Sequence, residues 1–265
     1  RVDGSSRLRA CDPQSSEMTI EYGELITCSI STAGSSGVFR FTGAAGEIVL
    51  VWSSNSFFLL DPQANSLTVY SNGVKLPVSG TYSIRVLGPV GSYFVQLERM
   101  VPPSPSMTRI EYGQTIEGSI ERVGQHDLFL FNAASGDLVD TRISPTTCTW
   151  APYLGLYDSQ GQGTGSRLTQ SGSHVIVVTA SSFSSSQVCG YRLGLQRISP
   201  PPASVRTLGY GQSLAGKIDP DTDMDVFIFS GVAGATITVQ VVRTGGQGSP
   251  QLGLYDPEAK SVSGS

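Results

Sequence analysis

The chain has 265 residues, a net charge of −4 and only 14% charged residues. Its 17 Lys and Arg residues form no cluster, which excludes the basic phosphate-binding surface of a nucleic-acid-binding protein. No apolar run approaches about 18 residues, so the sequence predicts no insertion into a membrane. Gly is abundant and apolar residues do not recur at helical spacing, which predicts an all-β fold with many turns.

One sequence pattern occurs three times, at intervals of about 95 residues. The copies begin with IEYGELITCSI at Ile20, IEYGQTIEGSI at Ile110 and LGYGQSLAGKI at Leu208. A repeat of this length is a whole domain that can bury its own core. The closing strands of the first two copies end at Met100 and Ile198, and the third copy has no counterpart of them. We therefore expect two complete domains and an incomplete third, which is either a truncated segment or a domain that strands of another chain complete.

The boundaries follow from these landmarks. Residues 1–16 are polar and irregular, and we expect a linker or the end of a preceding unit. The chain starts at Arg1 and has no signal peptide, which suggests a processed or excerpted polypeptide. Because Pro favours extended backbone, we expect the Pro-rich segments between repeats to be short, semi-rigid spacers that string the domains like beads. The predicted units are repeat 1 (17–100), a linker (101–106), repeat 2 (107–198), a linker (199–203) and partial repeat 3 (204–265).

Apolar and polar residues alternate along several segments, such as TYSIRV from Thr81 and SYFVQL from Ser92. Alternation indicates strands with one buried face, as in an antiparallel sandwich of two sheets. EIVLVW from Glu47 and LFLF from Leu128 are nearly continuous apolar runs. These runs predict strands that are partly covered on both faces.

Four cysteines in a chain of low charge indicate disulfides and an oxidising compartment. Pairing Cys148 with Cys189 would stabilise repeat 2 by roughly 3.5–4 kcal/mol, and pairing Cys11 with Cys28 would contribute roughly 3 kcal/mol. Free buried thiols are the alternative, whereas no Cys and His spacing supports a metal site. We expect the two disulfides and an extracellular or cell-surface location.

The ordered set of motifs resembles the bacterial pre-peptidase C-terminal domain, over both full copies and the first two thirds of the third. The resemblance implies compact jelly-roll-like β-sandwiches that accompany secreted hydrolases or form surface arrays, and it supplies no catalytic residue. Copy one departs from the pattern with GVFRF and LLDPQA, which weakens any shared ligand site there. The motifs are DLFLF at Asp127, DVFIF at Asp225, LYDSQG at Leu156, LYDPEA at Leu254, LPVSGTYSIRV at Leu76 and GSYFVQLER at Gly91.

The run DPDTDMD places Asp219, Asp221, Asp223 and Asp225 at alternating positions. Such a loop can present several carboxylate oxygens to one cation, and Ca²⁺ accepts about six to eight oxygen ligands. The Gly and Glu positions of an EF-hand are absent, and the other copies lack the run. The alternative is a solvated acidic turn whose carboxylates accept hydrogen bonds from nearby backbone amides. Calcium is the candidate cofactor, and none is required by the sequence.

Hydrolytic chemistry has little support in the sequence. A Ser/His/Asp site needs a nucleophile held beside its base, and no GxSxG elbow or similar signal occurs. The histidines are His126 and His174, which we interpret as satisfied surface or strand-edge residues. Asp61, Asp158 and Asp256 each follow a strand and precede turn residues, so turn formation explains them better than acid/base catalysis. We expect a non-catalytic protein.

Aromatic residues offer a carbohydrate-binding hypothesis. Tyr22, Tyr112 and Tyr210 recur before Gly, which favours packing over ligand binding at those positions. Trp52 lies near a strand end, and Trp150 lies in an irregular segment beside Cys148. Because exposed aromatic rings can stack on sugars, Trp150 is the candidate ligand-binding residue.

Two functional hypotheses remain open. The first is a non-catalytic extracellular array acting in surface structure, adhesion or fibre assembly, with strands of a neighbouring molecule completing repeat 3. Its expected partners are further copies joined head to tail, other cell-surface proteins or polysaccharide. The alternative is the accessory substrate-binding or spacer region of a secreted bacterial hydrolase.

Overall fold

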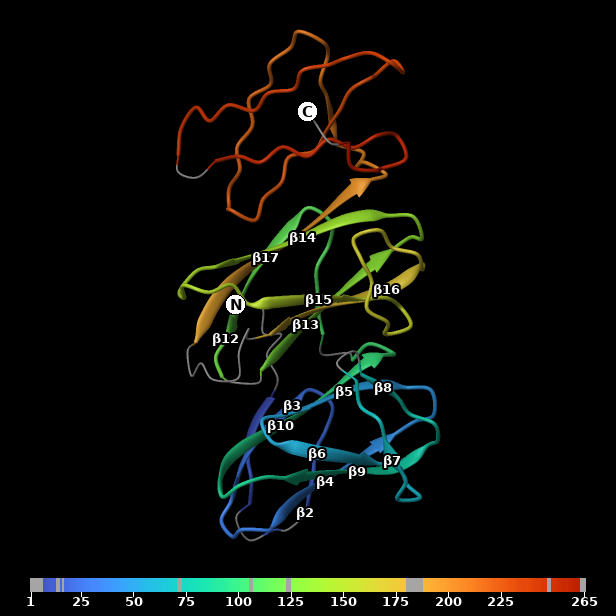
Figure 1. The fold of residues 1–265 in the computed structure, drawn as a ribbon, viewed down its shortest axis with the longest axis vertical. Coiled ribbons are helices and arrows are strands. Elements are labelled where there is room, and N and C mark those ends of the chain that lie inside the picture. Colours follow the sequence, from blue (N-terminus) through green and yellow to red (C-terminus); the bar gives the residue numbers. More distant parts are fainter. Residues whose placement is uncertain are drawn as a thin grey trace.

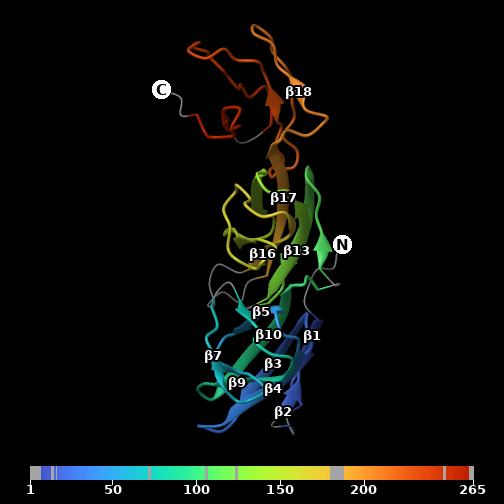
Figure 2. The ribbon, with the colours of Figure 1, turned by 90° about the vertical axis from the view of Figure 1, so that its right-hand side faces the viewer.

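The computed structural model describes residues 7–12, 15, 17–70, 73–104, 107–122, 125–179, 188–246 and 249–262. These residues contain strands and turns but no helix, which confirms the all-β prediction. Three bodies lie end to end along the longest axis of the molecule (Figure 1), and the perpendicular view shows the same stacking (Figure 2). They correspond to the three sequence repeats.

Repeat 1 is a sandwich of two sheets. One sheet has the order β1-β3-β10-β5-β8 and the other β2-β4-β9-β6-β7. Neighbours are antiparallel, except that the short edge strands β1 and β2 pair parallel with β3 and β4. The strands are β1 (Arg7–Ala10), β2 (Glu17–Thr19), β3 (Glu24–Ile30), β4 (Ser36–Gly43), β5 (Ile48–Ser53), β6 (Ser56–Leu60), β7 (Ser66–Leu67), β8 (Val74–Lys75), β9 (Gly80–Leu87) and β10 (Gly91–Val101).

Repeat 2 repeats this arrangement. Its sheets have the orders β12-β17-β14 and β11-β13-β16-β15, and the edge strand β11 again pairs parallel with its neighbour. Inward-facing side chains from both sheets form one core, in which Tyr191 and Leu193 are fully buried. The strands are β11 (Thr108–Arg109), β12 (Gln114–Ile120), β13 (His126–Ala133), β14 (Leu138–Pro145), β15 (Tyr153–Tyr157), β16 (Gly172–Thr179) and β17 (Cys189–Ser199).

The last two strands of each complete repeat occupy the centres of its two sheets. In repeat 1, β10 lies between β3 and β5 while β9 lies between β4 and β6. In repeat 2, β17 lies between β12 and β14 while β16 lies between β13 and β15. In each sheet of a complete repeat, one of these late strands therefore joins the strands on its two sides.

Repeat 3 is incomplete, as the sequence predicts. Its described residues contain only the short strands β18 (Arg206–Thr207) and β19 (Phe227–Ile228), which pair parallel, besides one isolated bridge near the end. Figure 1 shows the rest as open loops at the end of the stack that is opposite repeat 1. Counterparts of the two central strands are absent from this described region, so neither sheet is joined.

Repeats 1 and 2 share a buried apolar junction. Ile48 and Leu50 of β5 and Met100 of β10 pack against one face of the sheet that contains β13 and β16. This contact explains the nearly continuous apolar runs, because one face of each strand lines its own core and the other lines the junction. The repeat 2 side of the junction consists of Leu128, Leu130, Val175 and Val177, with Met107 and Tyr157 at its margin.

The predicted spacer between repeats 1 and 2 is closely integrated with this junction. Val101, its first residue, is the last residue of β10, and Ser104 is buried. The side-chain oxygen of Gln96, on β10, accepts a hydrogen bond of 3.1 Å from the backbone N–H of His126, which is the first residue of β13. The His126 ring lies 4.9 Å from the Trp52 ring, measured between centroids. Direct packing therefore fixes the first two repeats relative to each other.

Both predicted disulfides are present. Cys11 and Cys28 tie the entrance of repeat 1 to β3, with Cα atoms 5.0 Å apart. Cys148 and Cys189 join the segment after β14 to the start of β17, with Cα atoms 5.2 Å apart. The second bridge anchors a central strand of repeat 2. Across the described residues, no helix is long and apolar enough to cross a membrane.

Candidate functional site

In repeat 2, the central strand β17 inserts a tyrosine against a buried carboxylate. The Tyr191 hydroxyl donates to Asp127 Oδ2 at 2.6 Å, and Gln125 Nε2 donates to Asp127 Oδ1 at 2.9 Å. Both Tyr191 and Asp127 are buried. Burial, followed by the negative charge of Asp127, raises the pKa of Tyr191 far above its ordinary value, so the hydroxyl stays protonated and donates. This contact links β17 in one sheet to β13 in the other.

A glycine on β12 makes room for that tyrosine. A Cβ atom built at Gly118 would lie 2.4 Å from Cζ of Tyr191, closer than any side chain tolerates. Repeat 1 provides room from a different strand, because a Cβ atom at Gly37 would lie 2.0 Å from the Tyr93 hydroxyl. Each complete sandwich therefore has a glycine, which lacks a Cβ atom, at the position where the tyrosine of its central strand packs.

The same central strands carry an arginine that covers the tyrosine of the YG motif. In repeat 1 the Arg99 guanidinium lies 5.1 Å from the Tyr22 ring centroid and donates to Glu47 Oε1 at 2.7 Å. The Tyr22 hydroxyl donates to Glu47 Oε2 at 2.8 Å. In repeat 2 the Arg197 guanidinium lies 5.1 Å from the Tyr112 ring centroid, and the Tyr112 hydroxyl donates to Asp137 Oδ2 at 2.9 Å.

Electrostatics at the Glu47 cluster favour the ionised carboxylate. Burial opposes ionisation, but the Ala44 backbone N–H, the Tyr22 hydroxyl and the Arg99 guanidinium together hold the pKa of Glu47 below its ordinary value. Burial, followed by the hydrogen bond to Glu47, raises the pKa of Tyr22. The hydroxyl therefore remains a donor to the charged carboxylate. The central strand is thus held at both ends, by its tyrosine and by its arginine.

Repeat 3 contains the receiving half of both contacts. In sequence, Gly216 aligns with Gly118, Asp225 with Asp127 and Tyr210 with Tyr112. Tyr210 keeps its edge contact with Phe229, 6.5 Å between ring centroids, as Tyr112 does with Phe131 in repeat 2 at 6.0 Å. The strand that would bring the second tyrosine and the arginine has no counterpart in the described part of repeat 3.

Apolar side chains of repeat 3 are exposed where their counterparts are buried. Leu214 and Ile218 have 41% and 49% of their surface exposed, whereas the aligned Ile116 and Ile120 have 9% and 0%. Tyr210 is 66% exposed. Leu214 and Ile218 thus leave open a surface that is sandwich interior in repeat 2. The other large apolar residues that are exposed in repeat 3 are Ile228, Val232, Val241, Val242, Leu252 and Tyr255.

The acidic run of repeat 3 docks on repeat 2, and its carboxylates have separate partners. Asp221 accepts a hydrogen bond from Ser144 and lies 3.7 Å from Arg192 Nη1. Asp219 pairs with Lys217, Asp223 accepts the Met224 backbone N–H at 2.8 Å, and Asp225 lies 3.5 Å from Arg206. Across the described residues, no group of three His, Cys, Asp or Glu side chains is arranged to hold a metal ion. The calcium site stays a prediction.

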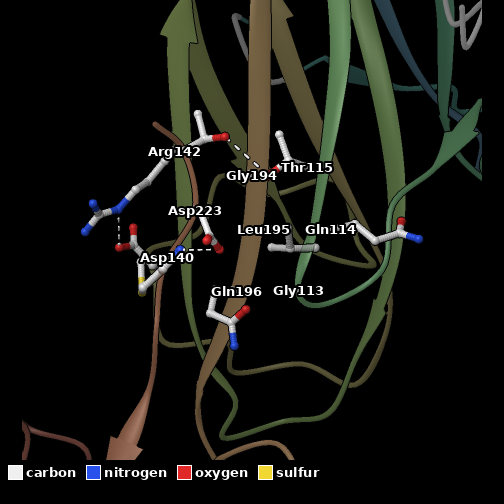
Figure 3. A pocket seen from close by; sticks show the side chains of 11 residues that line it. Gly113, Gln114, Thr115, Asp140, Arg142, Gly194, Leu195, Gln196 and Asp223 are labelled. Carbon is white, nitrogen blue, oxygen red and sulfur yellow. Dashed lines mark hydrogen bonds and ion pairs between the residues drawn. The ribbon is translucent and has the colours of Figure 1, made fainter. Parts of the chain in front are cut away.

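The junction between repeats 2 and 3 is polar. Figure 3 shows Asp140 and Arg142 of β14 and Asp223 of repeat 3 lining a shallow cleft beside Gly194. Arg142 Nε donates to Asp140 Oδ2 at 3.1 Å. In the sequence alignment Asp140 and Arg142 replace Leu50 and Trp52 of the first junction, and Gly194 replaces Gln96. The second junction therefore lacks the apolar lining of the first.

The other candidate residues lie apart from this surface. Trp150 is partly buried beside the Cys148–Cys189 bridge, with its Nε1 atom enclosed and without a hydrogen-bond partner among the described residues. Its role in ligand binding stays a prediction. The prediction of surface histidines is wrong: His126, the first residue of β13, is buried in the first junction, and His174 is buried beside the core residue Phe131 of repeat 2. Residues of two packed sheets bury these histidines, and the sequence around each histidine does not show which residues those are.

Asp61, Asp158 and Asp256 form turns, as predicted. Asp61 Oδ1 accepts the backbone N–H of Gln63 at 2.9 Å, and Asp158 Oδ1 that of Gln160 at 2.9 Å. Asp256 Oδ1 accepts the backbone N–H of Lys260 at 2.8 Å. Their carboxylates therefore shape three equivalent loops.

The sequence reasoning missed the tyrosine niche and the apolar junction. Gly118 and Gly216 occur at the same place in copies two and three, and each has an aspartate nine residues later. That shared pattern was the available signal, because a glycine inside an alternating strand often marks a close approach. No protein-family model matches the chain, and a search of curated proteins finds no match.

Proposed function

We propose that this chain is a non-catalytic extracellular β-sandwich repeat protein that acts in surface structure, adhesion or fibre assembly. In this proposal, repeat 3 is completed by strands that another molecule donates, so that molecules join head to tail. The disulfides support a protein that folds in an oxidising compartment. The apolar junction supports a stiff rod built from repeats 1 and 2.

The observation that carries the proposal is the open interior of repeat 3. Leu214 and Ile218 face solvent at positions that are buried in repeat 2, and unpaired backbone accompanies them. An exposed sheet edge with apolar side chains is a template for a strand from another chain. Because the accepting repeat lies at the opposite end of the stack from repeat 1, donation between molecules extends the rod.

Electron microscopy of the protein in its native material tests this function. We expect rods joined end to end, with sandwich-sized beads and cross-links between repeat 3 of one molecule and a donor strand of the next. Isolated rods in which repeat 3 remains open would contradict the assembly function. Hydrolytic activity that resides in the 265-residue chain itself would contradict its non-catalytic character.

A further inference from the structure

We propose that repeat 2 selects the repeat that follows it at a glycine notch, and that this joint is a hinge that salt can release. The outer face of β12, β14 and β17 receives Thr222 of repeat 3 over Gly194, and exposed ion pairs surround this contact. The joint consists of residues of this chain alone and needs no strand from another molecule. It is therefore independent of the assembly proposed above.

Gly194 lies on the outer face of β17, paired with Thr115 of β12 (Figure 3). Its neighbours Leu193 and Leu195 belong to the core of repeat 2, and side chains alternate between the two faces of a strand. A Cβ atom at Gly194 would lie 2.6 Å from the backbone oxygen of Thr222 and 3.1 Å from its Cβ atom. The three heavy atoms nearest to this added Cβ all belong to Thr222. The missing side chain thus makes room for the loop of repeat 3.

The residues of repeat 3 that contact repeat 2 are its buried ones. In the described part of repeat 3, only Thr222 and Ala259 are buried, at 4% and 6% exposure. The hydroxyl oxygens of Thr222 and Thr115 lie 3.3 Å apart. Arg167 Nη2, on repeat 2, donates to the backbone carbonyls of Glu258 and Ala259, each at 2.7 Å. Repeat 3 is therefore held at two points, and both contacts are polar.

The first junction uses the same strand position with different chemistry. Gln96 aligns with Gly194, because each lies three residues after the tyrosine of its central strand. The side-chain oxygen of Gln96 accepts the backbone N–H of His126, directly after the loop that aligns with the loop of Thr222. A glutamine reaches across to the next repeat, whereas a glycine lets the next repeat approach the strand itself. This position therefore determines which loop the following repeat can present.

The charged contacts around the notch are exposed. Asp221 lies 3.7 Å from Arg192 Nη1, with side chains that are 57% and 36% exposed, and it accepts a hydrogen bond from Ser144. Arg192 also pairs with Glu117 of its own repeat at 3.1 Å. Salt at roughly 1 M screens exposed charges beyond about 3 Å, so it weakens the pair between the repeats. The apolar side chains that line the first junction are not subject to this screening.

Nitrogen-15 relaxation of the full-length chain tests the hinge, because it measures how fast each repeat tumbles. At about 0.01 M NaCl we expect repeat 3 to share one rotational correlation time with repeats 1 and 2. At about 1 M NaCl we expect repeat 3 to tumble faster, while repeats 1 and 2 still tumble as one body. If the ratio of the two correlation times is the same at both salt concentrations, the release by salt is wrong.

Gly194→Ala tests the notch at low salt. We expect it to lower the ratio of docked to released repeat 3 by roughly tenfold or more, because the added Cβ would overlap the backbone of Thr222. Gly165→Ala is the matched control, since an added Cβ there has no heavy atom within 4 Å, and repeat 3 should stay docked. Urea denaturation should find repeat 2 no less stable in either variant. Equal tumbling of repeat 3 in Gly194→Ala and in the unmodified chain would overturn the notch.

Asp221→Asn tests the charged part of the joint. We expect repeat 3 to be released at a lower salt concentration than in the unmodified chain, because the pair with Arg192 is lost. Asp219→Asn is the control in the same loop, since Asp219 pairs at 2.5 Å with Lys217 of repeat 3 itself. Adding Arg192→Gln to Asp221→Asn should lower the release concentration little further, because both changes remove one shared contact. Equal release concentrations for Asp221→Asn and Asp219→Asn would contradict this pair.

Discussion

The Tyr191 hydroxyl and the Asp127 carboxylate form a hydrogen bond of 2.6 Å in the interior of repeat 2. Tyr191→Phe would leave the carboxylate with one donor fewer while it stays buried. We expect the free energy of unfolding to fall by roughly 1–3 kcal/mol, measured by urea denaturation followed by circular dichroism. The matched control is Tyr93→Phe, because repeat 1 has Gly37 instead of an aspartate and should lose less.

Comparison of the Tyr191→Phe and Tyr93→Phe variants also gives the outcome that would contradict this prediction. An equal loss for the two Tyr→Phe variants would mean that the contact with Asp127 adds nothing to the contribution of the tyrosine hydroxyl. In that case Asp127 would not be the reason for the tyrosine. The comparison is informative because both rings are almost completely buried, at 0% and 5% exposure.

Glu47 makes the stability of repeat 1 dependent on pH. Its pKa is lowered in the folded state from an ordinary value of 4.5, so its contribution is present above that pH and is lost as the pH falls through the folded-state pKa. We expect Glu47→Gln to be less stable than the unmodified protein at pH 7 and the difference to shrink below about pH 4.5. Thermal unfolding between pH 7 and 3 measures it, with Glu111→Gln as the exposed control. A difference that stays constant across this range would contradict the role of the ionised carboxylate.

At the scale of elements, the sequence predicts much of the fold. Alternation along β9 and β10 identifies the buried face of each strand, and three equivalent aspartates mark three turns. Alternation does not say which strand lies beside which, because pairing depends on contacts between residues far apart in the chain. The central positions of the late strands therefore required the structure.

The candidate site was less predictable for a related reason. Gly118 on its own looks like a weak strand residue, since glycine has low strand propensity. The requirement for glycine follows from the packing of Tyr191, more than seventy residues later in the chain, against this position. The burial of His126 is equally hidden from the local sequence, because Trp52 and Gln96, which pack against it, belong to the preceding repeat.

The first junction offers a prediction at the scale of elements. Leu50 is 4% exposed and packs in the junction, while its counterpart in repeat 2 is Asp140. Because the fold accepts an aspartate at that position, Leu50→Asp should separate the repeats without unfolding them. We expect one urea transition for repeats 1 and 2 to split into two.

Val90→Asp provides the control for this substitution. Val90 is 57% exposed on the loop between β9 and β10, so an aspartate at this position adds the same charge away from the junction. Splitting in both variants, or in neither, would show that the junction does not couple the repeats. Small-angle scattering provides a second measurement, since separated repeats should sample larger radii of gyration.

At the scale of the whole molecule, order should decrease along the stack. β10 and β17 have hydrogen-bonded neighbours on both sides, whereas the described strands of repeat 3 are two residues long. Amide hydrogen exchange should therefore be slow in β10 and β17 and fast through repeat 3 in the isolated molecule. Mass spectrometry of peptic fragments measures this difference. Equal protection in repeats 2 and 3 would contradict the open state of repeat 3.

The late position of the central strands sets an order of events during synthesis. A ribosome makes the flanking strands of a repeat first, and they pair at most with short edge strands until the last two strands emerge. Each sandwich therefore closes in one late step that depends on long-range contacts, which are slow to form. A polypeptide with this topology stays open until a repeat is finished. Repeat 1 closes first and presents its apolar face as a ready surface on which repeat 2 can fold.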